Sequence, residues 1–287
     1  MEQPVSERIK KPDWLKIKLP TGNNFSELNK NIQNNKLHTI CESGRCPNKE
    51  ECWGAGTATI MILGNVCTRS CQFCNVETGK PEAVDIFEPA RVAQSVAKMG
   101  AKHIVLTSVD RDDLIDGGTS IWAATVRAIR KHAPGVTMET LIPDFQGKKD
   151  LLDIIVEVNP EVVSHNVETV ERLSREVRIQ AQFSRSLEVL KYLKDGGIRR
   201  TKSGIMLGLG ETEAELIETL DALREAKVDI VTMGQYLQPT RKHLEVKKYI
   251  TPEEFEQYRQ IALSKGFMYV ESGPMVRSSY HAEKHIV

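Results

Sequence analysis

Six cysteines are the residues whose type and spacing most directly suggest chemistry. All of them lie between Cys41 and Cys74, and the rest of the 287-residue sequence contains none. Cysteines grouped in this way cannot cross-link a whole chain as the disulfides of a small secreted domain do. They indicate metal binding in a reducing compartment.

The second group of three is Cys67, Cys71 and Cys74, with the spacing Cys-x3-Cys-x2-Cys. A four-iron cluster needs four ligands, so three thiolates leave one iron open to a small molecule. A structural zinc site would need four closed ligands, and no second pair or histidine partner is evident nearby. Phe73, just before the last cysteine, is also typical of enzymes that bind S-adenosylmethionine (SAM) at such a cluster and generate a radical from it.

The first group is Cys41, Cys46 and Cys52, with the rarer spacing Cys-x4-Cys-x5-Cys. Taken alone, this spacing is only a moderate sign of metal binding. We refer to the two groups as the first triad and the second triad.

The elements that must position the triads alternate between short apolar runs and amphipathic stretches. This alternation predicts a parallel sheet built from βα units. Thr212 with Glu215 and Thr251 with Glu254 have the capping-box spacing of helix starts. The predicted strands are 58–63, 103–109, 137–142, 162–165, 202–207 and 229–235.

Six βα units suit either a partial barrel or an open doubly wound sheet, and in both the site lies at the carboxyl ends of the strands. Candidate SAM-binding residues at that edge are Asn166 and Glu168 for polar contacts, and Gly208 and Gly210 for close backbone approach. After the second strand, Asp110, Asp112 and Asp113 are candidates either for supporting the metal ligands or for capping the loop.

The sequence resembles the lipoyl synthase family of radical SAM enzymes over nearly its whole length. The resemblance lies in CESGRCPNKEECW, CTRSCQFC and GPMVRSSYHA, and also in KPDWLKIKLP, DRDDLIDGG, TKSGIMLGLGET and MGQYLQPT. It implies an α/β fold, a partial (βα)6 TIM-like radical SAM barrel whose N-terminal and C-terminal extensions cap the site. The expected parts are an extension with the first triad (1–56), the barrel (57–266) and a C-terminal segment (267–287), integrated into one domain.

The resemblance further implies two 4Fe-4S clusters. The second triad would hold the cluster that binds SAM, and the first would hold an auxiliary cluster that is consumed as the sulfur source. Ser279, in the motif from Arg277 to Tyr280, would be the fourth ligand of the auxiliary cluster. Arg277 would neutralise charge beside it. The implied reaction inserts two sulfur atoms at C6 and C8 of an octanoyl group attached to a lysine of a carrier protein.

The implied partners are an octanoylated lipoyl carrier domain or H-protein, a low-potential electron donor of the flavodoxin or ferredoxin type, and a cluster-repair protein. Lysine plus arginine and aspartate plus glutamate both number 39, so net charge favours no nucleic-acid partner. No apolar run is long enough to cross a bilayer. We expect a cytoplasmic enzyme, with an organelle interior as the alternative if a transit peptide has been removed.

Two other functions fit the cysteines. One is a different two-cluster radical SAM enzyme that inserts sulfur into a free acid or a small heterocycle, although the Arg277 to Tyr280 motif argues against it. The other is a non-catalytic iron–sulfur or zinc protein, which the iron content and the spectral response to SAM would distinguish.

Overall fold

The computed structural model describes residues 10–16, 24–54 and 58–286. Its main sheet has eight strands in the order β1-β2-β5-β6-β7-β8-β9-β10. The strands are β1 (His38–Thr39), β2 (Thr59–Ile62), β5 (His103–Ser108), β6 (Thr137–Leu141), β7 (Val162–Ser164), β8 (Thr201–Leu207), β9 (Ile230–Gln235) and β10 (Tyr269–Gly273). A two-stranded sheet joins β3 (Val66–Cys67) and β4 (Glu77–Thr78).

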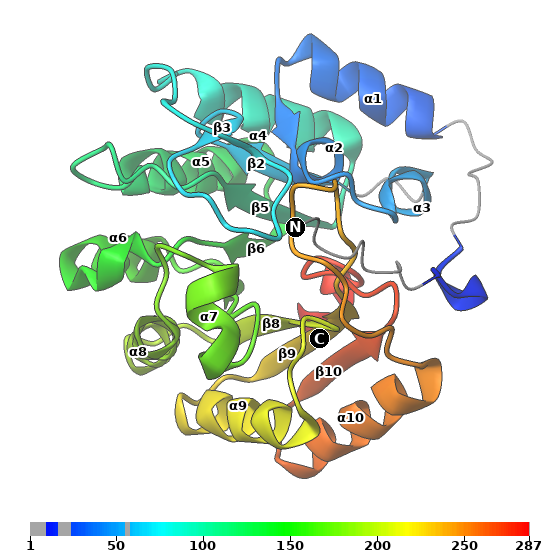
Figure 1. The fold of residues 1–287 in the computed structure, drawn as a ribbon. Coiled ribbons are helices and arrows are strands. Elements are labelled where there is room, and N and C mark those ends of the chain that lie inside the picture. Colours follow the sequence, from blue (N-terminus) through cyan, green and yellow to red (C-terminus); the bar gives the residue numbers. More distant parts are fainter. Residues whose placement is uncertain (1–9, 17–23, 55–57, 287) are drawn as a thin grey trace.

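The six predicted strands are all present, within two residues of their predicted ends. From β2 to β10 every neighbouring pair is parallel, as βα units require, whereas β1 runs antiparallel to β2. The edge strands β1 and β10 are additional to the prediction, and they do not pair with each other. The sheet is therefore a curved partial barrel with an open side (Figure 1).

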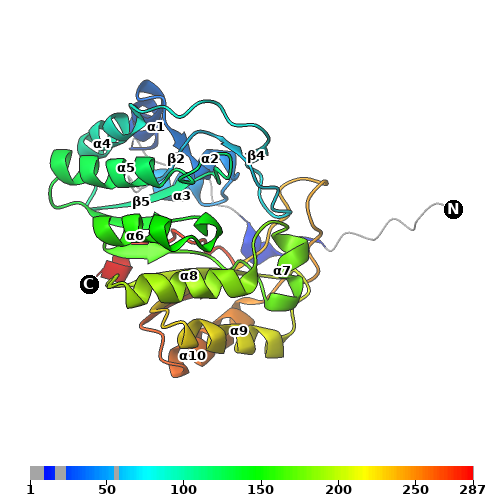
Figure 2. The same cartoon turned by 90° about the vertical axis from the view of Figure 1, so that its left-hand side faces the viewer.

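Helices cover the outer, convex face of this sheet (Figure 1). They are α4 (Glu88–Met99), α5 (Thr119–His132), α6 (Lys149–Val158), α8 (Phe183–Asp195), α9 (Glu213–Glu225) and α10 (Pro252–Ser264). The shorter α7 (Glu171–Val177) lies toward the same end of the molecule as β4 (Figure 2). Before the barrel come α1 (Asn24–Asn34), α2 (Ile40–Ser43) and α3 (Lys49–Gly54), and 3-10 turns occur at Asp13–Leu15, Phe145–Gly147 and Ala282–Ile286. No helix in the described part of the chain is long and apolar enough to cross a membrane.

The helix starts predicted from capping boxes are confirmed. Thr212 accepts a hydrogen bond from the amide of Glu215 at the start of α9, and Thr251 does the same with Glu254 at the start of α10. In each case the glutamate side chain accepts a hydrogen bond from the backbone amide of the capping threonine. These bonds satisfy amides that a helix start leaves without partners, so local sequence alone fixes where α9 and α10 begin.

The C-terminal segment runs back into the open side of the barrel. The sheet continues past residue 266 into β10, so the predicted C-terminal part shares a strand with the barrel. Beyond it, the turn Ala282–Ile286, which we call η3, buries His285 completely. The carbonyl of His285 accepts a hydrogen bond from Arg200 at 2.8 Å, so the end of the chain is anchored to the start of β8.

Candidate active site

The second triad lies in the loop after β2, as predicted, and all three thiols line one cavity of about 590 Å³. We call it the carboxyl-end cavity because it includes Ser108, Leu141 and Met206, at or next to the carboxyl ends of β5, β6 and β8. The loop is held by bonds from the rest of the chain. The amide of Asp110 donates to Cys67 Sγ at 3.3 Å, and the ring Nε2 of His243 lies 2.9 Å from the carbonyl of Cys74.

Arg69 is a site residue that the sequence did not single out. Its side chain, which is 5% exposed, forms ion pairs of 2.7 Å with Asp112 and with Asp144, and one of 3.2 Å with Asp110. Asp113 instead pairs with Arg111. Two of the three loop aspartates therefore fix the backbone between the first two cysteines of the triad. The only sign of this role in the sequence was the position of a basic residue between Cys67 and Cys71.

The first triad is carried by α2, α3 and the turn between them. Thr39 caps α2 by accepting from the amide of Glu42, and this sets the direction in which the next turn leaves. Cys41, Cys46 and Cys52 line a second cavity of about 890 Å³. We call it the amino-end cavity because Thr59 and His103, the first residues of β2 and β5, also line it.

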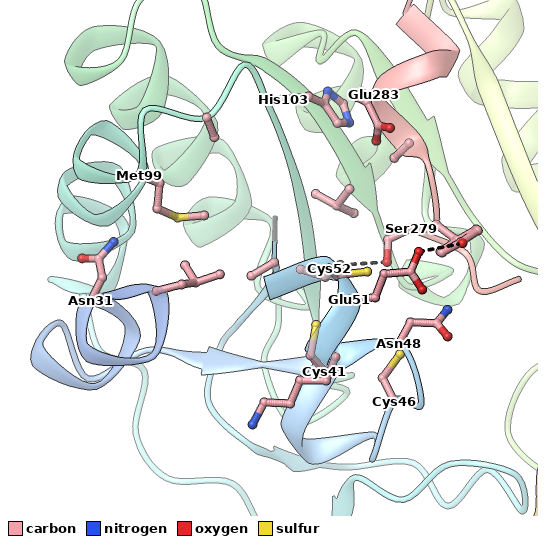
Figure 3. A pocket seen from close by; sticks show the side chains of 18 of the residues that line it. Asn31, Cys41, Cys46, Asn48, Glu51, Cys52, Met99, His103, Ser279 and Glu283 are labelled. Carbon is pink, nitrogen blue, oxygen red and sulfur yellow. Dashed lines mark hydrogen bonds between the residues drawn. The ribbon is translucent and has the colours of Figure 1, made fainter. Parts of the chain in front are cut away.

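Ser279 lies beside the first triad although more than two hundred residues separate them. Its hydroxyl accepts a hydrogen bond from Thr59 Oγ1 at 2.8 Å, and the side chain projects toward Cys52 in Figure 3. Asn48, between two cysteines of the triad, donates to the carbonyl of Met275 at 2.7 Å. The C-terminal segment is thus hydrogen-bonded to residues beside the first triad, and the role of Ser279 as a metal ligand stays a prediction.

The two cavities share one wall. Cys41, Cys46, Thr59, Arg277 and Ser279 line both of them, whereas Cys52 lines only the amino-end cavity and the second triad lines only the carboxyl-end cavity. Burial lowers the pKa of Arg277, and a thiolate at Cys46 opposes that shift. Arg277 is thus a partly buried cation near Cys46 that lines both cavities.

The thiols fit iron–sulfur clusters. No disulfide joins any two of the six cysteines. Burial, together with neighbouring negative groups, raises the pKa of Cys52 and of Cys71 to about 12. Burial also raises the pKa of Cys74, to about 11. The protein alone therefore favours the protonated thiols of Cys52, Cys71 and Cys74, and the positive charge of bound iron would hold them deprotonated.

The predicted SAM-binding residues divide into two pairs. Asn166 and Glu168 line the carboxyl-end cavity, where Asn166 Nδ2 donates to Glu168 Oε1 at 3.0 Å and to Ser278 Oγ at 2.7 Å. Gly208 and Gly210 are not among the described residues that line it. A Cβ on Gly208 would lie 2.3 Å from the carbonyl oxygen of Lys248, so close packing alone explains why a glycine occupies this position.

The strand glycines that line the carboxyl-end cavity are instead Gly204 and Gly234, on β8 and β9. A Cβ on Gly204 would meet Asn166 Oδ1 at 2.9 Å, and one on Gly234 would meet the carbonyl oxygen of Val276 at 2.1 Å. Both allow a polar segment to approach the inner face of the sheet. Sequence patterning missed them because neither occurs in a turn. The contribution of Gly208 and Gly210 to SAM binding stays a prediction.

Residues from both terminal segments line the carboxyl-end cavity, as the predicted capping of the site requires. Lys11, from the described part of the N-terminal segment, lines the carboxyl-end cavity, and so do Val276 and Ser278 from the C-terminal segment. The remainder of the predicted N-terminal cap at 1–9 and 17–23 lies outside the described residues.

A partial parallel barrel with a three-cysteine loop after its first βα strand is the arrangement of a radical SAM enzyme. Residues 61–234 match the model of the Radical SAM superfamily, and residues 1–46 match that of the N-terminal domain of lipoyl synthase of the Radical SAM family. The chain is 65% identical over 279 residues to "Lipoyl synthase, mitochondrial" of Nematostella vectensis, covering 97% of this chain and 96% of that one. It therefore belongs to the lipoyl synthase family, as the sequence motifs indicated.

A second relative agrees with this assignment, and two solved structures share the fold. Lipoyl synthase of Flavobacterium psychrophilum is also 65% identical, over 97% of this chain and 96% of that one. Methylornithine synthase (PylB) superposes with a TM-score of 0.52 at 15% identity, over 88% of this chain and 82% of that one. The hydrogenase maturase HydG superposes at 0.55 and 14% identity, over 92% and 71%. At such identities the two structures show a common fold only.

Proposed function

We propose that this chain completes the lipoyl group on a carrier protein, with separate duties for its two triads. The second triad would hold the 4Fe-4S cluster that binds SAM. The first triad and Ser279 would hold an auxiliary 4Fe-4S cluster. When bound, the first of these clusters supplies the electron that converts SAM into a hydrogen-abstracting radical, and the auxiliary cluster supplies sulfur to C6 and C8 of an octanoyl-lysine.

The shared wall between the cavities supports this division most directly. Each triad faces the carboxyl-end cavity with at least two thiols, so a substrate in that cavity would contact both sites without leaving it. Transfer between fixed sites is favoured because the reacting groups are already held close together. Asn166 and Glu168, on the same cavity, are our candidates for polar contacts with SAM.

Arg277 and Ser279 would do different work. Arg277 places a fixed positive charge where the two cavities meet, and it would offset negative charge on bound sulfur or on the cluster. Ser279 offers a harder oxygen donor than cysteine, and its hydroxyl is much less acidic than a thiol. We propose that it marks the iron that is released when sulfur is given up.

The partners and setting belong to the same proposal. The carrier would be an octanoylated lipoyl domain or H-protein, the electron donor a flavodoxin or ferredoxin, and a repair protein would renew the auxiliary cluster. One of the relatives named above is bacterial, and the name of the other describes it as mitochondrial. We therefore keep bacterial cytoplasm and organelle interior as the two settings in which this enzyme would work.

Anaerobic turnover of an octanoyl-lysine peptide with SAM and dithionite, followed by mass spectrometry, tests the function. The expected product gains two sulfur atoms. Ser279→Ala should abolish sulfur insertion while 5′-deoxyadenosine still forms, whereas Ser279→Cys should retain the cluster but release sulfur more slowly.

Ser278→Ala is the matched control for these variants. The Ser278 hydroxyl accepts a hydrogen bond from Asn166, and Ser278 lines only the carboxyl-end cavity, so its loss should leave the auxiliary iron in place. Full sulfur insertion by Ser279→Ala with an unchanged cluster spectrum would refute the assignment of Ser279.

A further inference from the structure

The neighbouring serines Ser278 and Ser279 have the same side chain but different surroundings. Ser278 Oγ accepts a hydrogen bond from Asn166, which follows β7, and Ser278 lines only the carboxyl-end cavity. Ser279 Oγ accepts one from Thr59, the first residue of β2, and Ser279 lines both cavities. Because the two hydroxyls have the same donor chemistry, residue type alone does not decide which one faces the first triad. The partners of the two hydroxyls differ, and they come from different strands.

Thr59 provides a fixed point for such a bond. Its side chain is 4% exposed, and β2 is paired on both sides, with β1 and with β5. A threonine side chain is branched at Cβ, so its rotation about the Cα–Cβ bond is restricted. The direction of the Thr59 hydroxyl is therefore set by the sheet and not by the C-terminal segment.

The other attachments of the C-terminal segment do not fix the Ser279 side chain. Asn48 donates to the carbonyl of Met275 at 2.7 Å, and the Tyr280 hydroxyl donates to Glu51 Oε1 at 3.1 Å. A serine side chain has three staggered positions about its Cα–Cβ bond, and neither attachment chooses among them. The 2.8 Å bond from Thr59 does, and Figure 3 shows it as the dashed line that ends at Ser279.

We propose that Thr59 is the positioning residue for Ser279, because its hydroxyl holds the Ser279 oxygen toward the first triad. This inference rests on the proposed function, in which Ser279 is a ligand of the auxiliary cluster. A hydroxyl oxygen has two lone pairs, so Ser279 can accept from Thr59 and still offer a lone pair to iron. Thr59 thus selects Ser279, while Asn166 holds Ser278 on the side of the second triad.

Thr59→Val tests the proposal because valine keeps the branched shape of threonine and removes the hydroxyl. Thr59→Ser keeps the hydroxyl and should restore the wild-type behaviour. Thr59→Ala is a second variant should Thr59→Val fail to fold. The matched control is Thr125→Val, since Thr125 is also buried, donates to the carbonyl of Ile121 at 2.7 Å within α5, and lines neither cavity. Both valine variants lose one buried hydrogen bond, but only one of these bonds reaches Ser279.

The measurement uses the full chain with Cys67, Cys71 and Cys74 all replaced by alanine, so that iron is held only at the first triad. Iron release to the iron(II) chelator bipyridyl is followed anaerobically. Thr59→Val should release iron about fivefold faster, the factor that corresponds to one buried hydrogen bond. It should also weaken the signal of the oxygen-bound iron in the Mössbauer spectrum. Thr59→Ser and Thr125→Val should resemble the parent protein in both measurements.

Combining Thr59→Val with Ser279→Ala separates this inference from the proposed function. The double variant should release iron no faster than Ser279→Ala alone, because the Thr59 hydroxyl then has no oxygen to hold. If the parent protein binds no iron, or if Ser279→Ala changes neither the rate nor the spectrum, the proposed function fails and the inference fails with it. If Ser279→Ala speeds release but Thr59→Val does not, only the inference is overturned. An equal effect of Thr59→Val with and without Ser279 would overturn it as well.

Discussion

Gly234 lies where the inner face of the sheet and the C-terminal segment come closest. A methyl group at this position would lie 2.1 Å from the carbonyl oxygen of Val276 and 3.0 Å from its carbonyl carbon. Since ordinary carbon–oxygen contacts are about 3.3 Å, Gly234→Ala must push this carbonyl away by about 1 Å. Ser279, three residues further on, would move with it.

The expected loss is larger for sulfur insertion than for stability. Overpacking of this kind costs about 1 to 3 kcal/mol of folding free energy, which leaves most of the protein folded. A displacement of about 1 Å at a reacting group can lower a rate about 100-fold. We therefore expect Gly234→Ala to lose sulfur insertion by about that factor while it still cleaves SAM.

Gly273→Ala is the matched control. Gly273 pairs with Gly234 across β9 and β10, and its added methyl would meet only Val276 Cγ2, at an ordinary 3.5 Å. The assay compares the ratio of thiolated peptide to 5′-deoxyadenosine in the two variants and in the wild type. Equal ratios in both variants, or a wild-type ratio in Gly234→Ala, would refute the argument that this contact places Ser279.

Three further predictions concern groups that hold the barrel together. Lys202 and Glu139 form a 2.9 Å ion pair with both side chains fully buried, so Lys202→Met should destabilise the fold by about 3 to 5 kcal/mol by chemical denaturation, and adding Glu139→Leu should restore much of this loss. Thr212→Ala removes the cap of α9 and should cost about 1 kcal/mol in the same assay, whereas Thr212→Ser should be close to neutral. Burial and the charge of Arg178 lower the pKa of His165 to about 4, while Ile142 and Ser186 hold its ring. Below the ordinary histidine pKa of 6.5, His165 is protonated in the unfolded chain but not in the folded protein. The contribution of His165 to stability should therefore be constant above pH 6.5 and fall as the pH drops toward the folded pKa, by about 2 kcal/mol at about pH 5. Because burial also lowers the pKa values of His285, His103 and His38, stability of His165→Gln should still fall with pH but with a shallower slope. An equal slope in both proteins would contradict the assignment.

The sequence by itself determined the parts of this protein that depend on short spacings. The spacing of Cys67, Cys71 and Cys74 predicted the second site, since three thiolates within one loop need no distant partner. Capping boxes predicted the starts of α9 and α10, because both partners lie within one helical turn. Apolar runs predicted six strands of the barrel, since a parallel strand that is buried on both faces is apolar throughout. The link between Ser279 and the first triad came from family resemblance, not from spacing.

Only the tertiary structure decided what depends on residues far apart in the chain. The short edge strand β1 and the less buried β10 have no clear pattern, and pairing with a neighbour defines them. Gly234 is required because the backbone of Val276 crosses it, and no local rule marks such a crossing. Ser279 meets Thr59 because β10 and η3 return the C-terminal segment to the start of β2. The wall that the two cavities share likewise depends on a sheet that curves without closing, since Arg277 and Ser279 of the C-terminal segment line both cavities.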